Sequence, residues 1–113
     1  METKKRLLQK YVTENGFCPF DEWLSEFKDK RSLAIIATRL NRVVQGNFGL
    51  CKRLEGGIQE LKIDYGSGFR IYFAEDGDTI VVLLCGGDKS TQGKDIELAK
   101  MYLADYLKWG RYA

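Results

Sequence analysis

The sequence predicts a single α+β domain, in which an antiparallel β-sheet is packed by an N-terminal helical hairpin and a C-terminal helix. Three observations predict this class. The spacing of apolar residues is helical between residues 19 and 46, has a period of two between residues 61 and 73, and is helical again after residue 91. The chain has 113 residues, 44% of them hydrophobic, which suits one packed core and is too short for two. We therefore expect residues 1–113 to form one domain.

Two helices are expected in the first half of the chain. The segment before them, residues 5–13, is ambiguous between a short strand and a frayed helix. Pro19 is favoured in the first turn of a helix, and apolar residues follow it at helical spacing up to Phe27. A second helix is expected to begin at Ser32 and to be closed by Gly46, with apolar residues along one side. Because the link between the helices is short, we expect an antiparallel hairpin.

Three strands and a last helix follow. Apolar and polar residues alternate over residues 61–65 and 69–73, which predicts two strands. Residues 80–85 are apolar without alternation, as is typical of a strand covered on both faces. The pair Asp76-Gly77 is typical of a two-residue hairpin turn. The apolar spacing at the end of the chain predicts a C-terminal helix of about five turns.

The alternation also predicts a register for the first two strands. A loop of residues 66–68 pairs apolar residues with apolar residues, whereas a two-residue loop would pair them with polar ones. In this register Lys62 lies opposite Tyr72, and Asp64 lies opposite Arg70. All four side chains then project from the polar face of the sheet, where Asp64 and Arg70 would form a surface pair.

The next turn completes a cluster on that face. Pairing across Asp76-Gly77 sets Arg70 opposite Leu83, and Lys89 then lies just beyond the end of the last strand. We therefore expect one basic cluster with a tyrosine in its midst. Its members are Lys62, Arg70, Lys89 and Tyr72.

Several kinds of chemistry are excluded by what the chain lacks. It has no histidine, which removes imidazole catalysis and histidine metal ligands. Asp76 and Asp78 flank a glycine, which is typical of a turn, so we expect no metal and no other cofactor. The three cysteines form no CxxC pair, and we expect small buried hydrophobes in a reducing compartment. They are Cys18, Cys51 and Cys85.

The chain shows no sign of membrane insertion or export. No apolar run approaches the ~18–20 residues that a membrane helix needs. Residues 1–6 are rich in charge, but only Leu7 and Leu8 follow them, which is too short for a signal peptide. We therefore expect a cytoplasmic protein that does not contact a membrane.

Positive charge is concentrated in one segment. The net charge is only +2, but residues 30–53 hold six basic residues and no acidic one. On the second helix Arg31, Arg39 and Arg42 fall within an arc of about 80°, opposite the apolar stripe. This row fits either a surface that contacts a polyanion or an ordinary solvated helix face. Both interpretations stay open at this point.

A glycine-rich segment, residues 86–91, lies between the last strand and the last helix. Backbone amides in such a place can hold a phosphate. A Walker loop would need glycine where Val82 stands and lysine directly after the second glycine, so we do not expect nucleotide hydrolysis. A turn with a serine or threonine cap explains the segment equally well.

Four segments carry a resemblance to a known family. In this order along the chain they resemble the RelE/ParE toxin superfamily, and within it the HigB-like addiction module killer proteins. The segments are Pro19–Leu24, Arg39–Gly49, Glu60–Phe73 and Leu83–Ile96.

The resemblance spans roughly residues 17–109 and implies a RelE-like fold. It also implies a toxin that cleaves mRNA, commonly on the ribosome, and a cognate helix-turn-helix antitoxin of the HigA-like type. Operator DNA would be contacted only through the antitoxin complex.

Residues of the family's site carry over by position. Arg70 matches the arginine of its glycine-aromatic-arginine motif, and Lys89 the lysine of its Gly-Gly-Asp-Lys motif. Lys62 stands on the preceding strand, where relatives place a basic residue. We add further basic residues as expected RNA contacts. These are Arg39, Arg42, Lys52, Arg53 and Lys94.

The expected activity is that of a metal-independent endoribonuclease. The 2′-hydroxyl of the RNA would attack the adjacent phosphate, which requires a proton acceptor, a proton donor and cations on the phosphate. Arg70 would bind the phosphate, Lys62 accept the proton, Lys89 stabilise charge or protonate the leaving group, and Tyr72 orient the sugar or stack on a base. Two alternatives stay open: a non-catalytic, ParE-like inhibitor of DNA gyrase, and an inactive, antitoxin-bound relic.

Overall fold

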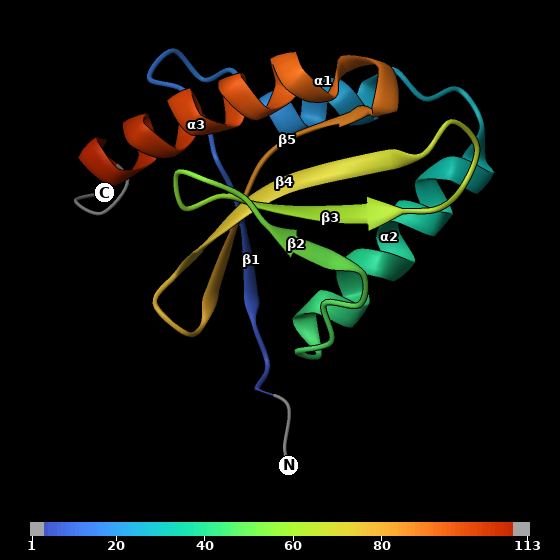
Figure 1. The fold of residues 1–113 in the computed structure, drawn as a ribbon, viewed down its shortest axis with the longest axis horizontal. Helices are drawn as coiled ribbons and strands as arrows, with labels where there is room; N and C mark the ends of the chain where they lie inside the picture. The colour runs from blue at the N-terminus through green and yellow to red at the C-terminus, as the bar shows by residue number, and fades with distance from the viewer. Residues whose placement is uncertain (1–3, 110–113) are drawn as a thin grey trace.

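The structure, a computed structural model, describes residues 4–109. Within this range the chain forms five strands, three α-helices and one short 3-10 helix (Figure 1). This confirms the α+β class. No helix in this range is long and apolar enough to cross a membrane. The elements are β1 (Leu7–Lys10), α1 (Pro19–Ser25), α2 (Lys30–Val44), β2 (Cys51–Arg53), β3 (Gln59–Ile63), β4 (Phe69–Asp76), β5 (Ile80–Asp88), η1 (Lys89–Thr91) and α3 (Gln92–Trp109).

The five strands form one sheet in the order β1-β5-β4-β3-β2. The strands β3, β4 and β5 pair antiparallel, as predicted. The short strand β2, which the sequence analysis did not predict, pairs antiparallel with β3. The strand β1 instead runs parallel to β5, with Leu7 opposite Ile80 and Lys10 opposite Leu83. The expectation of a purely antiparallel sheet is therefore wrong. No hairpin turn links β1 to β5, so neither the direction of β1 nor its pairing could be predicted from local sequence.

Each face of the sheet has its own hydrophobic core. On one face the helices α1 and α2 enclose a cluster that includes Trp23, Ile36 and Ile71. On the other face α3 encloses a second cluster, with Tyr72 and Leu103 among its members. Because α3 packs over β4 and β5, the middle of the sheet is covered on both sides. We refer to the two sides as the α1/α2 face and the α3 face.

The two N-terminal helices do not form the antiparallel hairpin that we expected. The helix α1 packs on β5, and in Figure 1 α2 runs away from it along the far side of the sheet. Arg39 of α2 donates hydrogen bonds to the carbonyls of Leu50 and Lys62, which places α2 beside β3. The rings of Trp23, Phe27 and Phe69 contact one another on the same face. Each helix therefore packs on the sheet, although the link between them is short.

The register between β3 and β4 differs from the expected one by two residues. Lys62 lies opposite Arg70, and Glu60 lies opposite Tyr72. The loop is longer than predicted because Asp64 and the residue after it leave the strand. A shift of two residues keeps every side chain on its expected face, so alternation cannot distinguish the two registers.

The strand β5 contains a β-bulge, which changes how its last residues pair with β4. Tyr72 lies opposite Cys85 but Phe73 lies opposite Leu83, so Leu84 is an extra residue in β5. The turn before β5 spans residues 77–79 and not the predicted two, because Asp76 pairs with Ile80. A bulge reverses which face the following residues occupy. The turn moves the pairing by three residues and the bulge by one more, so that Gly87, and not Leu83, lies opposite Arg70.

The glycines that follow the bulge lie beneath helices on opposite faces. A Cβ atom on Gly86 would be 2.3 Å from ring carbons of Trp23 in α1. A Cβ atom on Gly87 would overlap the carboxylate of Asp95 in α3. The glycine pair therefore lets two helices approach β5 closely from both sides, and it does not form the loop that we expected at this point.

Candidate functional site

A small cavity opens on the α3 face, where β2, β3 and β4 meet the first turn of α3. Its volume is about 310 Å³. We call it the basic pocket, because three cationic side chains and one carboxylate line it. The lining residues are Leu50, Cys51, Lys52, Glu60, Lys62, Arg70 and Gln92.

Strand pairing brings these charges together. Lys62 lies directly opposite Arg70, and Lys52 lies opposite Glu60. Residues that pair across neighbouring strands project from the same face of a sheet. The structure therefore places two of the expected catalytic residues, Lys62 and Arg70, in one pocket with Lys52, an expected RNA contact.

Arg70 is buried, and its position corrects our expectation. Its Nε lies 3.6 Å from Oε2 of Glu60, and its Nη1 donates to the carbonyl of Gly68 at 3.4 Å. Gln92 donates to the same Glu60 oxygen at 2.8 Å. The predicted surface pair between Arg70 and Asp64 is wrong, because the register shift leaves Asp64 in the loop and α3 covers this part of the sheet.

The ion pair between Arg70 and Glu60 is almost completely buried. Only 6% of Arg70 and 5% of Glu60 is exposed. Among the described residues, Nε of Arg70 makes no hydrogen bond. A guanidinium has five N–H donors, and a buried donor without a partner is costly. This Nε faces the Glu60 carboxylate at 3.6 Å, so the Arg70 charge is balanced by the ion pair.

Tyr72 occupies a different environment from the one predicted. It is fully buried in the core under α3, so it cannot stack on an RNA base as we expected. Its hydroxyl makes no hydrogen bond within the part of the chain that is described. Burial, followed by the negative charge of Glu60, raises its pKa. Tyr72 therefore stays protonated and lies behind Glu60.

Lys89 lies next to the pocket but does not line it. It is exposed in η1, directly after Asp88. The Asp88 carboxylate accepts hydrogen bonds from the backbone and hydroxyl of Ser90, which lower its pKa, and Arg70 lowers it further. Thr91 completes the capping box and donates to Asp95. Residues 88–91 of the glycine-rich segment are thus a capped helix start, which holds Lys89 outside the lining of the pocket.

The remaining expected RNA contacts do not form one surface. Strand pairing sets Arg53 on the α1/α2 face, away from Lys52. Lys94 is exposed on the first turn of α3. Arg39 is half-buried, and its guanidinium donates to the carbonyls of Phe48, Leu50 and Lys62. Its guanidinium therefore holds α2 against the neighbouring loop and β3. The three arginines of α2 do not form a row of fully solvated side chains.

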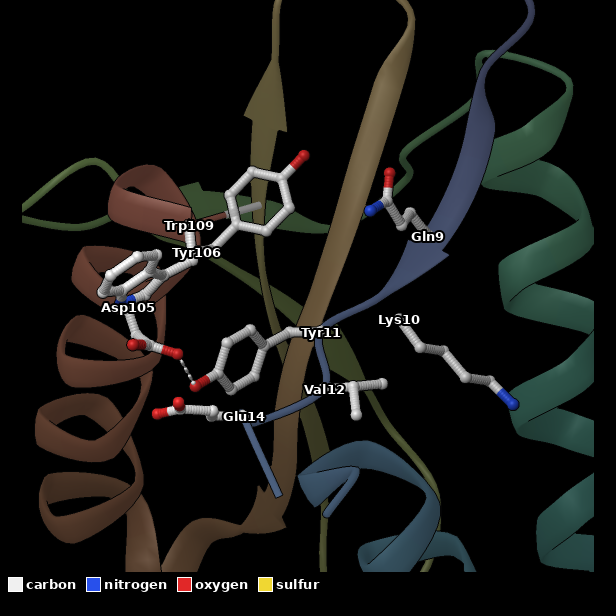
Figure 2. Close-up of a pocket in the computed structure, with 8 residues that line it drawn as sticks. All are labelled: Gln9, Lys10, Tyr11, Val12, Glu14, Asp105, Tyr106 and Trp109. Atoms are coloured by element: carbon white, nitrogen blue, oxygen red, sulfur yellow. Dashed lines mark hydrogen bonds between the residues drawn. The ribbon is translucent and has the colours of Figure 1, made fainter. Parts of the chain in front are cut away.

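A second pocket lies between β1 and α3, with a volume of about 400 Å³. In Figure 2 the ring of Tyr11 lies at its centre, and the Tyr11 hydroxyl donates a hydrogen bond to the Asp105 carboxylate, with Glu14 beside this pair. Burial, followed by Asp105, raises the pKa of Tyr11. The rings of Tyr11 and Tyr102 stack, with centroids 5.1 Å apart. Tyr11 thus packs β1 against α3, and Lys10 is the one basic side chain among the described residues that line this pocket.

The described residues contain no group of three or more metal-ligating side chains. Asp76, which we assigned to a turn, accepts a hydrogen bond from the hydroxyl of Tyr106. Asp78 accepts one from Lys4. Both carboxylates therefore have structural partners.

Glu60 and Gln92 are the site residues that the sequence reasoning missed. Glu60 occupies a polar position in an alternating strand, which we interpreted as solvent-exposed. One signal was available: Glu60 and Arg70 carry opposite charges on neighbouring strands and on the same face. Gln92 could not be found in this way, because its contact with Glu60 depends on how α3 crosses the sheet.

Fold and site together define a class: a small α+β domain whose sheet carries a cationic pocket built around a buried arginine–glutamate pair. Residues 22–108 match the family described as Phage derived protein Gp49-like (DUF891), and the chain belongs to this family. An uncharacterized protein of Haemophilus influenzae is 51% identical over 82 residues, which are 73% of this chain and 83% of that protein. The Gp49-like family is associated with the toxins of toxin–antitoxin modules, which implies an antitoxin partner.

Proposed function

We propose that the protein is the toxin of a type II toxin–antitoxin module and a metal-independent endoribonuclease that cleaves mRNA in the cytoplasm, on the ribosome. The HigB-like resemblance and the family support the toxin assignment. The observation that carries the proposed chemistry is the basic pocket, where Lys52 and Lys62 line the same cavity as the buried Arg70–Glu60 pair. A HigA-like antitoxin would then neutralise the protein.

The reaction needs no group from outside the chain and the RNA. The 2′-oxygen of one nucleotide attacks the adjacent phosphorus, and the bond from phosphorus to the 5′-oxygen of the next nucleotide breaks. The products are a 2′,3′-cyclic phosphate and a 5′-hydroxyl. The 2′-oxygen must lose a proton and the 5′-oxygen must gain one.

The pocket suggests which residue performs each part. Arg70 would hold two phosphate oxygens, because its planar guanidinium matches their geometry. Glu60 replaces Lys62 as our candidate proton acceptor, because its carboxylate lies beside the guanidinium that would hold the phosphate. Lys62, opposite Arg70, would protonate the leaving 5′-oxygen. Lys89 and Lys52 would bind neighbouring phosphates. Tyr72 would act only indirectly, by packing behind Glu60.

Induction in cells tests this proposal against its alternatives. Wild-type protein and Arg70→Lys would be produced at equal levels, followed by sequencing of RNA ends and measurement of DNA breaks. We expect growth arrest with new ends inside coding messages for the wild type, and far fewer for Arg70→Lys. Broken DNA with intact messages would replace the proposal with a gyrase-directed inhibitor. Soluble, folded wild-type protein that causes no arrest would indicate an inactive relic.

A further inference from the structure

A groove lined by arginines runs between α2 and the end of β3, on the α1/α2 face. Arg31, Arg39 and Arg42 line its helix side, and Ile35 and Ile63 form part of its floor. Its volume is about 470 Å³. The stretch from Arg31 to Arg42 is about 16 Å long at 1.5 Å per helical residue. This arginine groove is therefore long enough for about three helical turns of a second segment.

The charges in the arginine groove are unbalanced. Arg31 and Arg42 are exposed, and among residues 4–109 none of the three arginines forms an ion pair. Asp64 is the one acidic side chain among the described residues that line the groove. Burial, followed by the charge of nearby Arg42, lowers the pKa of Arg39. An occupant with carboxylates would relieve this repulsion.

The floor of the groove favours a peptide over a nucleic acid. Single-stranded RNA binds where aromatic faces are open for stacking. Tyr65, the aromatic residue of the groove, is half-buried and packs against Phe69, with ring centroids 6.0 Å apart. Ile35 is half-buried and instead presents aliphatic surface, with the buried Ile63 beneath it, which suits the apolar side of an amphipathic helix.

We propose that the arginine groove binds an acidic amphipathic segment of a partner protein. Its carboxylates pair with Arg31 and Arg42, and its apolar side chains pack on Ile35 and Ile63. That the partner is an antitoxin rests on the proposed function, but the binding itself does not. The groove lies on the α1/α2 face and the basic pocket opens on the α3 face, so the segment binds without filling the pocket.

The test uses a displayed library of random 16-residue peptides, selected on the wild-type protein and counter-selected on the double variant Arg31→Gln, Arg42→Gln. A matched control, Lys94→Gln with Lys108→Gln, removes two exposed charges from α3 on the other face. We expect the enriched peptides to be acidic and amphipathic. Their affinity should fall at least tenfold in the arginine variant and less than twofold in the control.

Isotope-labelled isoleucine methyl groups locate the binding. The selected peptide should shift the signals of Ile35 and Ile63, both in the wild type and in the cleavage-defective Arg70→Lys protein. Peptide binding to the arginine groove is thereby tested independently of RNA cleavage. The proposal is overturned if no acidic peptide is enriched, or if the two methyl signals do not move. It is equally overturned if a short uridine-rich RNA shifts them at lower concentration than the peptide does.

Discussion

Replacing Arg70 with alanine should lower message cleavage by about two to three orders of magnitude, because a contact to the transition-state phosphate contributes ~3–4 kcal/mol. The structure adds a second effect. Glu60 would remain buried without its cation, and breaking a buried pair in this way costs about 3–5 kcal/mol of folding free energy. Cleavage of a ribosome-bound message and urea unfolding, measured on the same preparation, separate the two effects.

Two further variants keep this prediction testable if Arg70→Ala is poorly folded. Arg70→Lys retains the charge beside Glu60 but loses the planar guanidinium, so it should fold and cleave much more slowly. The double variant Glu60→Gln, Arg70→Gln removes both charges together and should fold without activity. Lys108→Ala, at the far end of α3, serves as the control with normal activity. A folded Arg70→Ala protein that cleaves at the wild-type rate would show that the site lies elsewhere.

Adding one methyl group at Gly86 should destabilise the fold by about 1–3 kcal/mol or more, since the new Cβ would overlap the ring of Trp23. That ring cannot easily move away, because Phe20, Phe27 and Phe69 pack around it. The expected result is a lower urea midpoint at an unchanged slope.

Gly93 in α3 provides the matched control for this substitution. Apart from its chain neighbours and the backbone of its own helix, no described atom lies within 4 Å of a Cβ built at this glycine. Alanine has the higher helix propensity, so Gly93→Ala should be neutral or stabilising by up to about 1 kcal/mol. Equal midpoints for Gly86→Ala and Gly93→Ala would contradict the close packing of α1 on β5.

The periodic signals in the sequence predicted the elements well, and their arrangement only in part. Alternation fixes which face a strand residue occupies, and on this basis Lys62 and Arg70 were expected on the same face. It does not fix register, since a two-residue slip preserves every face, and Arg70 was therefore paired with the wrong carboxylate. The bulge at Leu84 and the parallel pairing of β1 depend on contacts between distant segments, which no local pattern encodes.

The burial of Tyr72 and Arg70 is the largest difference between the predicted and the observed site, and it has a single cause. We interpreted the even-numbered positions of β4 as a solvent-facing row, although Tyr72 and Ala74 are less polar than such a row usually is. The helix α3 crosses this face, so Tyr72 joins the core and Arg70 becomes a buried cation. The candidate residues were thus largely predictable by position, whereas their environments and the roles of Glu60 and Gln92 required the packing of α3.

The chemical nature of the cut RNA ends tests the central claim most directly. Purified protein would be incubated with ribosomes carrying a defined message, and the termini of the fragments determined. Attack by the 2′-oxygen predicts a 2′,3′-cyclic phosphate on the upstream fragment and a 5′-hydroxyl on the downstream one, both strongly reduced with Arg70→Lys. A 3′-hydroxyl and a 5′-phosphate would contradict the account, because those ends require water as the nucleophile and a different arrangement of the site.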